Sequence, residues 1–288
     1  GGQGYQFYRP DMNGAALRRI GLGVALQRAI RHREFELEYQ PQVDLNNGEV
    51  VGLEALVRWR HPERGQIPPD QFIPLAEELG LMTPLGDLIL EMACMQMADW
   101  KRQHQPVLRL AVNLSAHQFK QADLLDHVNK WIDKAGLDSS LIELELTETS
   151  IMHDPEAAAD ILGRLSKAGV RVTVDDFGTG YSSLAYLKRF PIDALKIDRS
   201  FVRDVTEDAS DGAIVRTIIA LARHLHLDVV AEGVETLAQL EFMRANNCRY
   251  AQGFYFSPAV PADKVFEVIA KLERQALAPV QDDIRLGA

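Results

Sequence analysis

Residues 141–176 read LIELELTETSIMHDPEAAADILGRLSKAGVRVTVDD and contain two apolar runs with a helical segment between them. Strand-forming residues fill 141–146 and 170–174, which predicts two short buried strands. Between them, Asp154 and Pro155 predict the start of a helix and Gly169 predicts its end. Strand, helix and strand in this order form the repeating unit of an α/β protein.

The same alternation extends in both directions from this segment. Eight apolar, β-branched runs lie at 37–40, 50–57, 107–113, 141–146, 170–174, 194–197, 228–231 and 249–252. Helical patterns separate the later runs, Pro261 predicts the start of a last helix, and α/β barrels commonly reach roughly 250 residues as a single unit. The predicted fold class is therefore α/β, with a TIM-type (β/α)8 barrel.

The first two runs depart from the repeat. Only nine residues separate 37–40 from 50–57, and they include Asn46, Asn47 and Gly48. This connection is too short for a parallel crossover but suits a hairpin. One barrel strand near the N-terminus is therefore predicted to be antiparallel.

Charge and composition exclude several classes of protein. The chain has 288 residues and a formal net charge of -10, so a nucleic-acid polymer is not an expected partner. Its two cysteines, Cys94 and Cys248, are too few and too far apart for a disulfide framework or a thiolate zinc site. No apolar run reaches the ~20 residues of a membrane helix. We expect a cytoplasmic location, which leaves open a membrane anchor in a longer protein.

Three segments are expected along the chain. Residues 1–15 are predicted to be a linker or the remnant of an upstream domain, 16–275 the barrel domain and 276–288 a C-terminal tail without apolar periodicity. The chain begins with Gly1 rather than methionine, which suggests a piece of a longer polypeptide.

Each predicted strand carries a polar residue inside or just after its apolar run. In a barrel of this kind the carboxyl ends of the strands gather the functional side chains at one mouth. We expect the following residues to meet there: Gln40, Glu54, Asn113, Glu145, Asp175, Asp176, Lys196, Glu232 and Gln252.

Five of these residues are acidic, and so many carboxylates cannot gather in one place unless cations or protons neutralise them. Because all the candidate ligands are oxygen donors, two Mg²⁺ or Mn²⁺ ions fit this site and Zn²⁺ does not. Two adjacent ions at such a site are suited to phosphoester hydrolysis, with Asp175 as a bridging ligand.

Lys196 has two interpretations at this stage. It could orient the attacking water or take its proton, or it could form a buried ion pair that stabilises the carboxylates without a chemical role.

The polar residues stand in motifs that resemble those of the EAL family of cyclic di-GMP phosphodiesterases. The sequence Glu54-Ala55-Leu56-Val57-Arg58 is similar to the signature of that family. Seven further motifs follow the family's order: Tyr39-Gln40-Pro41, Asn113-Leu114-Ser115, Glu145-Leu146-Thr147-Glu148, Asp175-Asp176-Phe177-Gly178-Thr179-Gly180, Leu195-Lys196-Ile197-Asp198, Glu232-Gly233-Val234-Glu235 and Gln252-Gly253-Phe254. The resemblance spans residues 17–272.

The resemblance implies a role for each matching residue. It implies that Glu54, Asn113, Glu145, Asp175, Asp176 and Glu232 are metal ligands, and that Glu235 supports the metals through bound water. It also implies that Lys196, Glu54 and Asp175 are catalytic, and that Gln40, Arg58, Asp198 and Gln252 bind substrate. Glu148, with Gly178 and Gly180, would hold the loop at 175–183. The implied reaction opens cyclic di-GMP to linear 5'-pGpG.

Two partners and two alternatives accompany this hypothesis. The lead-in at residues 5–12 resembles the end of a GGDEF cyclase module, and the family implies a homodimer. One alternative is a catalytically silent receptor that binds cyclic di-GMP, although no metal ligand and no lysine of the motifs is lost. The other is a Mg²⁺-dependent barrel enzyme that stabilises an enolate, which would not explain the paired aspartates with Arg58 and Gln40.

Overall fold

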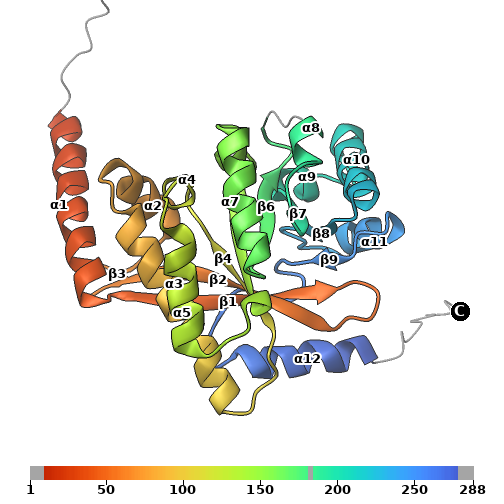
Figure 1. The fold of residues 1–288 in the computed structure, drawn as a ribbon, viewed down its shortest axis with the longest axis horizontal. Coiled ribbons are helices and arrows are strands. Elements are labelled where there is room, and N and C mark those ends of the chain that lie inside the picture. The colour runs from red at the N-terminus through yellow and green to blue at the C-terminus, as the bar shows by residue number, and fades with distance from the viewer. Residues whose placement is uncertain (1–9, 181–183, 278–288) are drawn as a thin grey trace, which may run out of the picture.

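The computed structural model describes residues 10–180 and 184–277, and eight strands within them close into a barrel (Figure 1). In chain order the barrel strands are β1 (Phe35–Asp44), β2 (Val50–His61), β4 (Arg109–Asn113), β5 (Ile142–Thr147), β6 (Arg171–Phe177), β7 (Ala194–Ile197), β8 (Asp228–Ala231) and β9 (Tyr250–Ala251). Each of these strands pairs with the one that follows it, and β9 pairs with β1. The predicted α/β barrel is confirmed.

β1 is the antiparallel strand that the short connection predicts. It pairs antiparallel with β2, where Gln40 lies opposite Glu54, and antiparallel with β9, while the other barrel pairs are parallel. The hairpin turn is held by the amide N–H of Gly48, which donates to the carbonyl of Asp44 at 2.8 Å. Gly48 has φ 77°, a left-handed conformation that costs a glycine little.

Helices cover the outside of the barrel, and their starts follow the capping residues of the sequence. Asp154 accepts a hydrogen bond from the N–H of Ala157, and Thr236 forms a capping box with Gln239. The helices are α1 (Pro10–His32), α2 (Pro69–Glu78), α3 (Met82–Arg102), α4 (Ala116–Phe119), α5 (Leu124–Ala135), α6 (Glu148–Met152), α7 (Pro155–Lys167), α8 (Leu184–Leu187), α9 (Arg199–Arg203), α10 (Ala209–Leu225), α11 (Leu237–Ala245) and α12 (Val265–Leu277), with a 3₁₀ turn at Ser139–Leu141. None of the helices in the described part of the chain is long and apolar enough to cross a membrane.

Three details differ from the sequence-based expectation. Two short strands, β3 (Gly65–Ile67) and β10 (Val260–Pro261), extend the sheet at β2 and β1. Pro261, expected to open the last helix, lies in β10, and α12 begins four residues later at Val265. α1 begins at Pro10, inside the segment expected to be a linker, and the predicted domain boundaries stay predictions.

The apolar core lies between the strands and the helix layer, and the barrel interior is polar at both ends. Side chains two residues apart on a strand face the same side. Val172 and Val174 of β6 are therefore buried against the helices, whereas Arg171, Thr173 and Asp175 face the interior. The interior consequently has a polar base at the amino ends of the parallel strands and a polar mouth at their carboxyl ends.

The base of the barrel is closed by an ion-pair network around Glu143. Its carboxylate lies 3.3 Å from both the Arg109 and the Arg171 guanidinium groups and accepts a 2.7 Å hydrogen bond from the Thr173 hydroxyl. The guanidinium group of Arg171 also forms ion pairs with Asp193 and Asp228. Because the side chain of Glu143 is only 4% exposed, these partners compensate for the loss of solvent around its carboxylate.

Replacing Glu143 by alanine should destabilise the domain by about 2–3 kcal/mol, because two partly exposed arginines lose their shared carboxylate and Thr173 loses its acceptor. Urea unfolding followed by circular dichroism measures the loss. The control is Glu36→Ala, which removes an exposed pair with Arg60 and should cost less than about 1 kcal/mol. Equal midpoints for the two variants would contradict this account of the base.

Candidate functional site

A cavity of about 430 Å³ opens at the carboxyl ends of the parallel strands. It is lined by Gln40, Glu54, Leu56, Asp175, Asp176, Asp198, Arg199, Glu232, Gly233, Glu235, Gln252, Gly253 and Phe254. Eight of the residues singled out in the sequence therefore share one cavity, the acidic mouth. Glu145 and Lys196 lie directly beneath it and are 1% and 0% exposed. The ammonium group of Lys196 donates hydrogen bonds to both Glu54 and Glu145.

Asp175 and Asp176 both reach the mouth because β6 is irregular at that point. Consecutive residues on a regular strand point to opposite faces. Here the pairing of β6 with β7 shifts register between Val174 and Phe177, and Asp176 has φ 52°, in the left-handed region. Aspartate tolerates this conformation better than most residues. The bulge thus brings two adjacent carboxylates to the same side of the sheet.

Lys196 is the centre of the charge arrangement. Its ammonium nitrogen lies 2.9 Å from Glu145 Oε2, 3.3 Å from Glu54 Oε2, 3.6 Å from Asp175 Oδ1 and 2.5 Å from Glu232 Oε1. Burial by itself lowers the pKa of Lys196, but the four carboxylates outweigh that effect and hold the pKa well above its ordinary value. Lys196 is therefore a positive charge at neutral pH.

One ammonium cannot balance four carboxylates, and the imbalance appears in the acids. Burial raises the pKa of Glu54, yet Lys196 and the amides of Gln252 and Asn113 reverse this and leave it lowered. Burial and the charge of Glu54 raise the pKa of Glu145 well above its ordinary value. Of these two glutamates, Glu54 is thus the ionised one, and Glu145 holds a proton when no further cation is present.

The outer acids show the same excess of negative charge. Burial, followed by the charges of Asp175 and Glu54, raises the pKa of Glu232 to about 8 against the opposing effect of Lys196. Burial and the charges of Asp175 and Asp198 raise the pKa of Asp176 to about 6. At neutral pH, Glu232 therefore holds a proton where an additional cation would otherwise supply the positive charge, whereas Asp176 is mostly ionised.

The side chains present at the mouth fit a divalent cation. Asp175, Asp176 and Glu232 each offer a carboxylate oxygen, and these atoms lie within 4.8 Å of one another. Glu145 Oε1 is buried and has no hydrogen-bond partner in the described residues, which is costly unless a ligand satisfies it. All these donors are oxygens, which hard cations prefer.

Two predicted residues, Asn113 and Arg58, approach the site from its edge. Asn113 donates to Glu54 Oε1 at 2.8 Å and so helps to fix that carboxylate. Arg58 lies outside the acidic mouth, in a neighbouring, largely apolar cavity of about 330 Å³ that Asn113 and Leu56 also line. Its guanidinium Nε donates to Glu38 at 2.7 Å, which leaves part of its planar fork available to a ligand.

Glu148 lies behind the loop that carries the aspartates. Its Oε2 accepts a 2.8 Å hydrogen bond from the N–H of Gly178, and its Oε1 would lie 2.8 Å from a Cβ at Gly180. Any larger residue at Gly180 would therefore displace this carboxylate. Residues 181–183 of the expected loop lie outside the described residues.

Five residues of the mouth were not singled out in the sequence: Leu56, Arg199, Gly233, Gly253 and Phe254. Each is in or next to a motif, so proximity along the chain was the available signal. Phe254 is 67% exposed, an unusual exposure for a phenylalanine.

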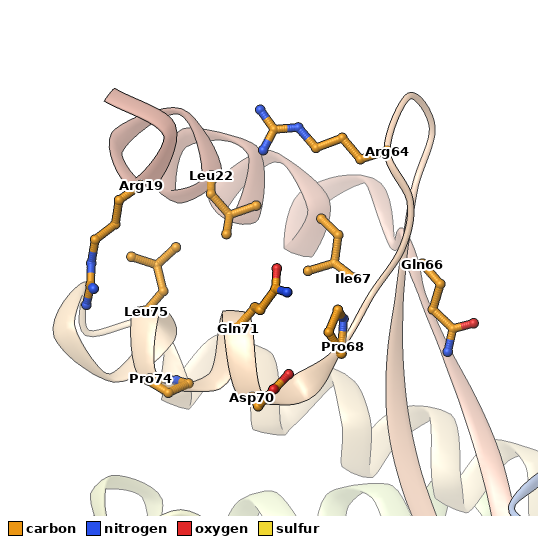
Figure 2. A pocket seen from close by; sticks show the side chains of 10 residues that line it. All are labelled: Arg19, Leu22, Arg64, Gln66, Ile67, Pro68, Asp70, Gln71, Pro74 and Leu75. Atoms are coloured by element: carbon orange, nitrogen blue, oxygen red, sulfur yellow. The ribbon is translucent and has the colours of Figure 1, made fainter. Parts of the chain in front are cut away.

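A third cavity, which is larger than the two described above, has a volume of about 710 Å³ and lies between α1, β3 and α2 (Figure 2). Its polar side chains include Arg19, Arg64 and Asp70, and Arg19 pairs with Glu78. Among the described residues it shares no lining residue with the acidic mouth. Volume alone therefore does not identify the chemical site, whereas the clustered carboxylates do.

Residues 24–259 match the family model described as the EAL domain. The chain belongs to this family. Among curated relatives, the EAL domain is 45% identical over 270 residues to the bifunctional diguanylate cyclase/cyclic di-GMP phosphodiesterase MucR of Pseudomonas aeruginosa, covering 94% of this chain and 39% of MucR. It is 43% identical to the cyclic di-GMP phosphodiesterase NbdA of the same organism, covering 96% of this chain and 35% of NbdA.

Solved structures agree with this assignment. The structure described as PaMucR phosphodiesterase in complex with c-di-GMP is 47% identical, with a TM-score of 0.81 over 83% of this chain and 97% of that chain. The EAL enzyme Bd1971, bound to cAMP and cyclic di-GMP, is 33% identical, with a TM-score of 0.83 over 90% of this chain and 71% of that chain.

The raised pKa of Glu232 predicts a pH dependence of the metal-free EAL domain. Between the ordinary carboxyl pKa of 4.5 and about 8, the folded state holds a proton that the unfolded state releases. This stabilisation is complete below pH 4.5 and is lost as the pH rises through 8. The melting temperature in chelator should therefore fall between about pH 5 and 8 and level off above this range.

Glu232→Gln should flatten this fall, since it removes the titrating group, whereas Glu241→Gln at an exposed position of α11 should keep the wild-type slope. Thermal melts across this pH range would provide the comparison. A Glu232→Gln slope as steep as that of the wild type would show that another group controls the effect.

Proposed function

We propose that this EAL domain hydrolyses cyclic di-GMP to linear 5'-pGpG with two Mg²⁺ or Mn²⁺ ions. The observation that carries the proposal is the convergence of Glu54, Asp175, Asp176 and Glu232 beside a buried lysine, with more negative charge than that lysine can balance. The similarity to MucR and NbdA, both named as cyclic di-GMP phosphodiesterases, supports the same substrate.

The residues that would hold the metal ions are Glu54, Asn113, Glu145, Asp175, Asp176 and Glu232, with Glu235 acting through water. When bound, two such ions would supply an activated water and stabilise the charge that develops on the phosphate oxygens. The rest of the chemistry concerns what the protein's own side chains do.

The charge of the mouth makes substrate binding depend on cations. The mouth gathers six carboxylates, and Arg199 is the single cationic side chain among the described residues that line it. A dinucleotide with two phosphate charges would be repelled by such a surface. Arg58, at the edge, can approach a phosphate or a guanine with the guanidinium N–H groups that do not bond Glu38 or Val57. Gln40, Asp198 and Gln252 remain the other proposed substrate contacts.

Lys196 would act as a charged hydrogen-bond donor to the attacking water rather than as a base in the metal-free arrangement. Its ammonium group is held charged by the surrounding carboxylates, which raise its pKa. A buried donor of this kind orients an oxygen that approaches it and stabilises negative charge on that oxygen. Both interpretations of Lys196 thus meet, since the ion pair itself positions the catalytic charge.

The decisive assay incubates the protein with cyclic di-GMP and Mg²⁺ or Mn²⁺ and separates the products by chromatography. We expect pGpG from the wild type, none above background from Glu54→Ala, and a kcat reduced by about 10²–10³ in Lys196→Ala with substrate binding largely retained. Binding of cyclic di-GMP by the wild type without turnover would instead establish a receptor. Wild-type rates in either variant would remove that residue from the mechanism.

Arg58→Leu should raise KM for cyclic di-GMP by about tenfold while kcat changes less, because a side chain that binds ground state and transition state equally affects affinity. The matched control is Arg60→Leu, two residues along β2, whose guanidinium is exposed and paired with Glu36. Steady-state kinetics with saturating Mn²⁺ measures both constants. An unchanged KM for Arg58→Leu would place the substrate elsewhere.

Three wider expectations stay predictions. The chain spans 39% and 35% of the lengths of MucR and NbdA, so an upstream GGDEF-like or regulatory domain in the complete protein is a proposal. A homodimer and a cytoplasmic location are likewise proposals that follow from the family resemblance and the composition.

A further inference from the structure

Gln42 is a buried polar residue beneath the acidic mouth that neither the motifs nor the lining of the cavity includes. It lies on β1 two residues after Gln40, so both side chains face the barrel interior. Its side chain is buried, with the residue 3% exposed, and its Nε2 lies 3.3 Å from Gln252 Oε1. A buried amide in a barrel interior requires a reason, since its burial is costly unless it is hydrogen-bonded.

The carboxylate of Glu54 fixes which way Gln252 must face. An ionised carboxylate only accepts hydrogen bonds, so the amide atom of Gln252 that faces it has to be Nε2. The second hydrogen of that nitrogen goes to Gln40 Oε1, at 3.2 Å. Gln252 Oε1 therefore points away from the carboxylates, towards Gln42.

The far end of this amide chain is fixed as well. Gln40 Nε2 donates to the carbonyl of Ser257 at 3.0 Å, and a carbonyl can only accept. Gln40 is thereby obliged to present its oxygen to Gln252. Both polar atoms of the Gln252 side chain are consequently bonded: the nitrogen to Glu54 and Gln40, and the oxygen to Gln42.

The opposite strand makes room for Gln42. Its register partner on β2 is Gly52, and a Cβ at Gly52 would lie 3.1 Å from Gln42 Oε1 and 3.4 Å from the carbonyl of Arg109. The absence of a side chain at position 52 therefore gives the Gln42 amide its space. The buried amide of Gln42 and the glycine opposite it at position 52 thus both contribute to the contact between Gln42 and Gln252.

We propose that Gln42 is a positioning residue for the metal site, because its N–H donor adds to Glu54 and Gln40 a third contact that keeps the Gln252 amide in place beside Glu54. If Gln252 turned over, its oxygen would face the Glu54 carboxylate and repel it. Glu54 would then lose one of the hydrogen-bond donors that orient it as a ligand. This inference rests on the proposed metal-dependent function and adds a residue outside the family motifs.

The test is isothermal titration of the folded protein with Mn²⁺ alone, without nucleotide. Gln42→Met keeps the length of the side chain and removes its donor. We expect it to weaken Mn²⁺ binding by about tenfold, the size of effect seen when a group that orients a metal ligand is removed. The matched control is Thr173→Val, which removes another buried donor, but at the base of the barrel, where it bonds Glu143.

Melting temperatures separate positioning from packing. Gln42→Met and Thr173→Val should lose similar thermal stability, whereas the loss of Mn²⁺ affinity should be confined to Gln42→Met. A second variant, Gly52→Ala, places a methyl group against Gln42 and should weaken Mn²⁺ binding in the same direction. This variant decides the question if Gln42→Met does not fold.

Each outcome bears on a different statement. If the wild type binds Mn²⁺ and hydrolyses cyclic di-GMP while both Gln42→Met and Gly52→Ala match its Mn²⁺ affinity within twofold, the role of Gln42 is refuted and the proposed function stands. If the wild type does not bind Mn²⁺, the proposed function fails and the role of Gln42 fails with it.

Discussion

The buried ammonium group of Lys196 is the interaction on which the site depends. It draws four carboxylates, on or directly after four different strands, to within 3.6 Å of one nitrogen, which no set of acids would do unaided. One ammonium group balances only one of the four negative charges, so the cluster keeps a surplus of negative charge. Lys196 therefore accounts for the attraction within the cluster, and the excess carboxylates account for its remaining demand for cations.

The antiparallel strand β1 connects the two polar ends of the barrel. Glu38, Gln40, Gln42 and Asp44 occupy alternate positions along it and meet, in turn, Arg58 at the rim, Gln252 at and below the mouth, and Arg249 at the base. Because β1 runs against its neighbours, the amino end of this strand lies at the mouth. A parallel strand in its place would reverse that order.

The sequence was sufficient for most of the strands and for the composition of the mouth, because apolar runs with a polar residue at the end are a local signal. It was insufficient for the base, since Glu143, Arg109 and Arg171 are about 30 residues apart and their pairing depends on strand register. Pro261 was misassigned because proline suits both the first turn of a helix and an edge strand such as β10. Gln42 could have been found by its two-residue spacing from Gln40.

Closure of the barrel joins segments from opposite ends of the chain. Gln252 directly follows β9, which pairs with β1, and it lies 212 positions after Gln40 in the sequence. During synthesis on the ribosome, a nascent chain therefore carries all six carboxylates of the acidic mouth before Gln252 has been added. An incomplete translation product that ends before Gln252 would consequently lack the contact that joins β1 to the Glu54 carboxylate through Gln252.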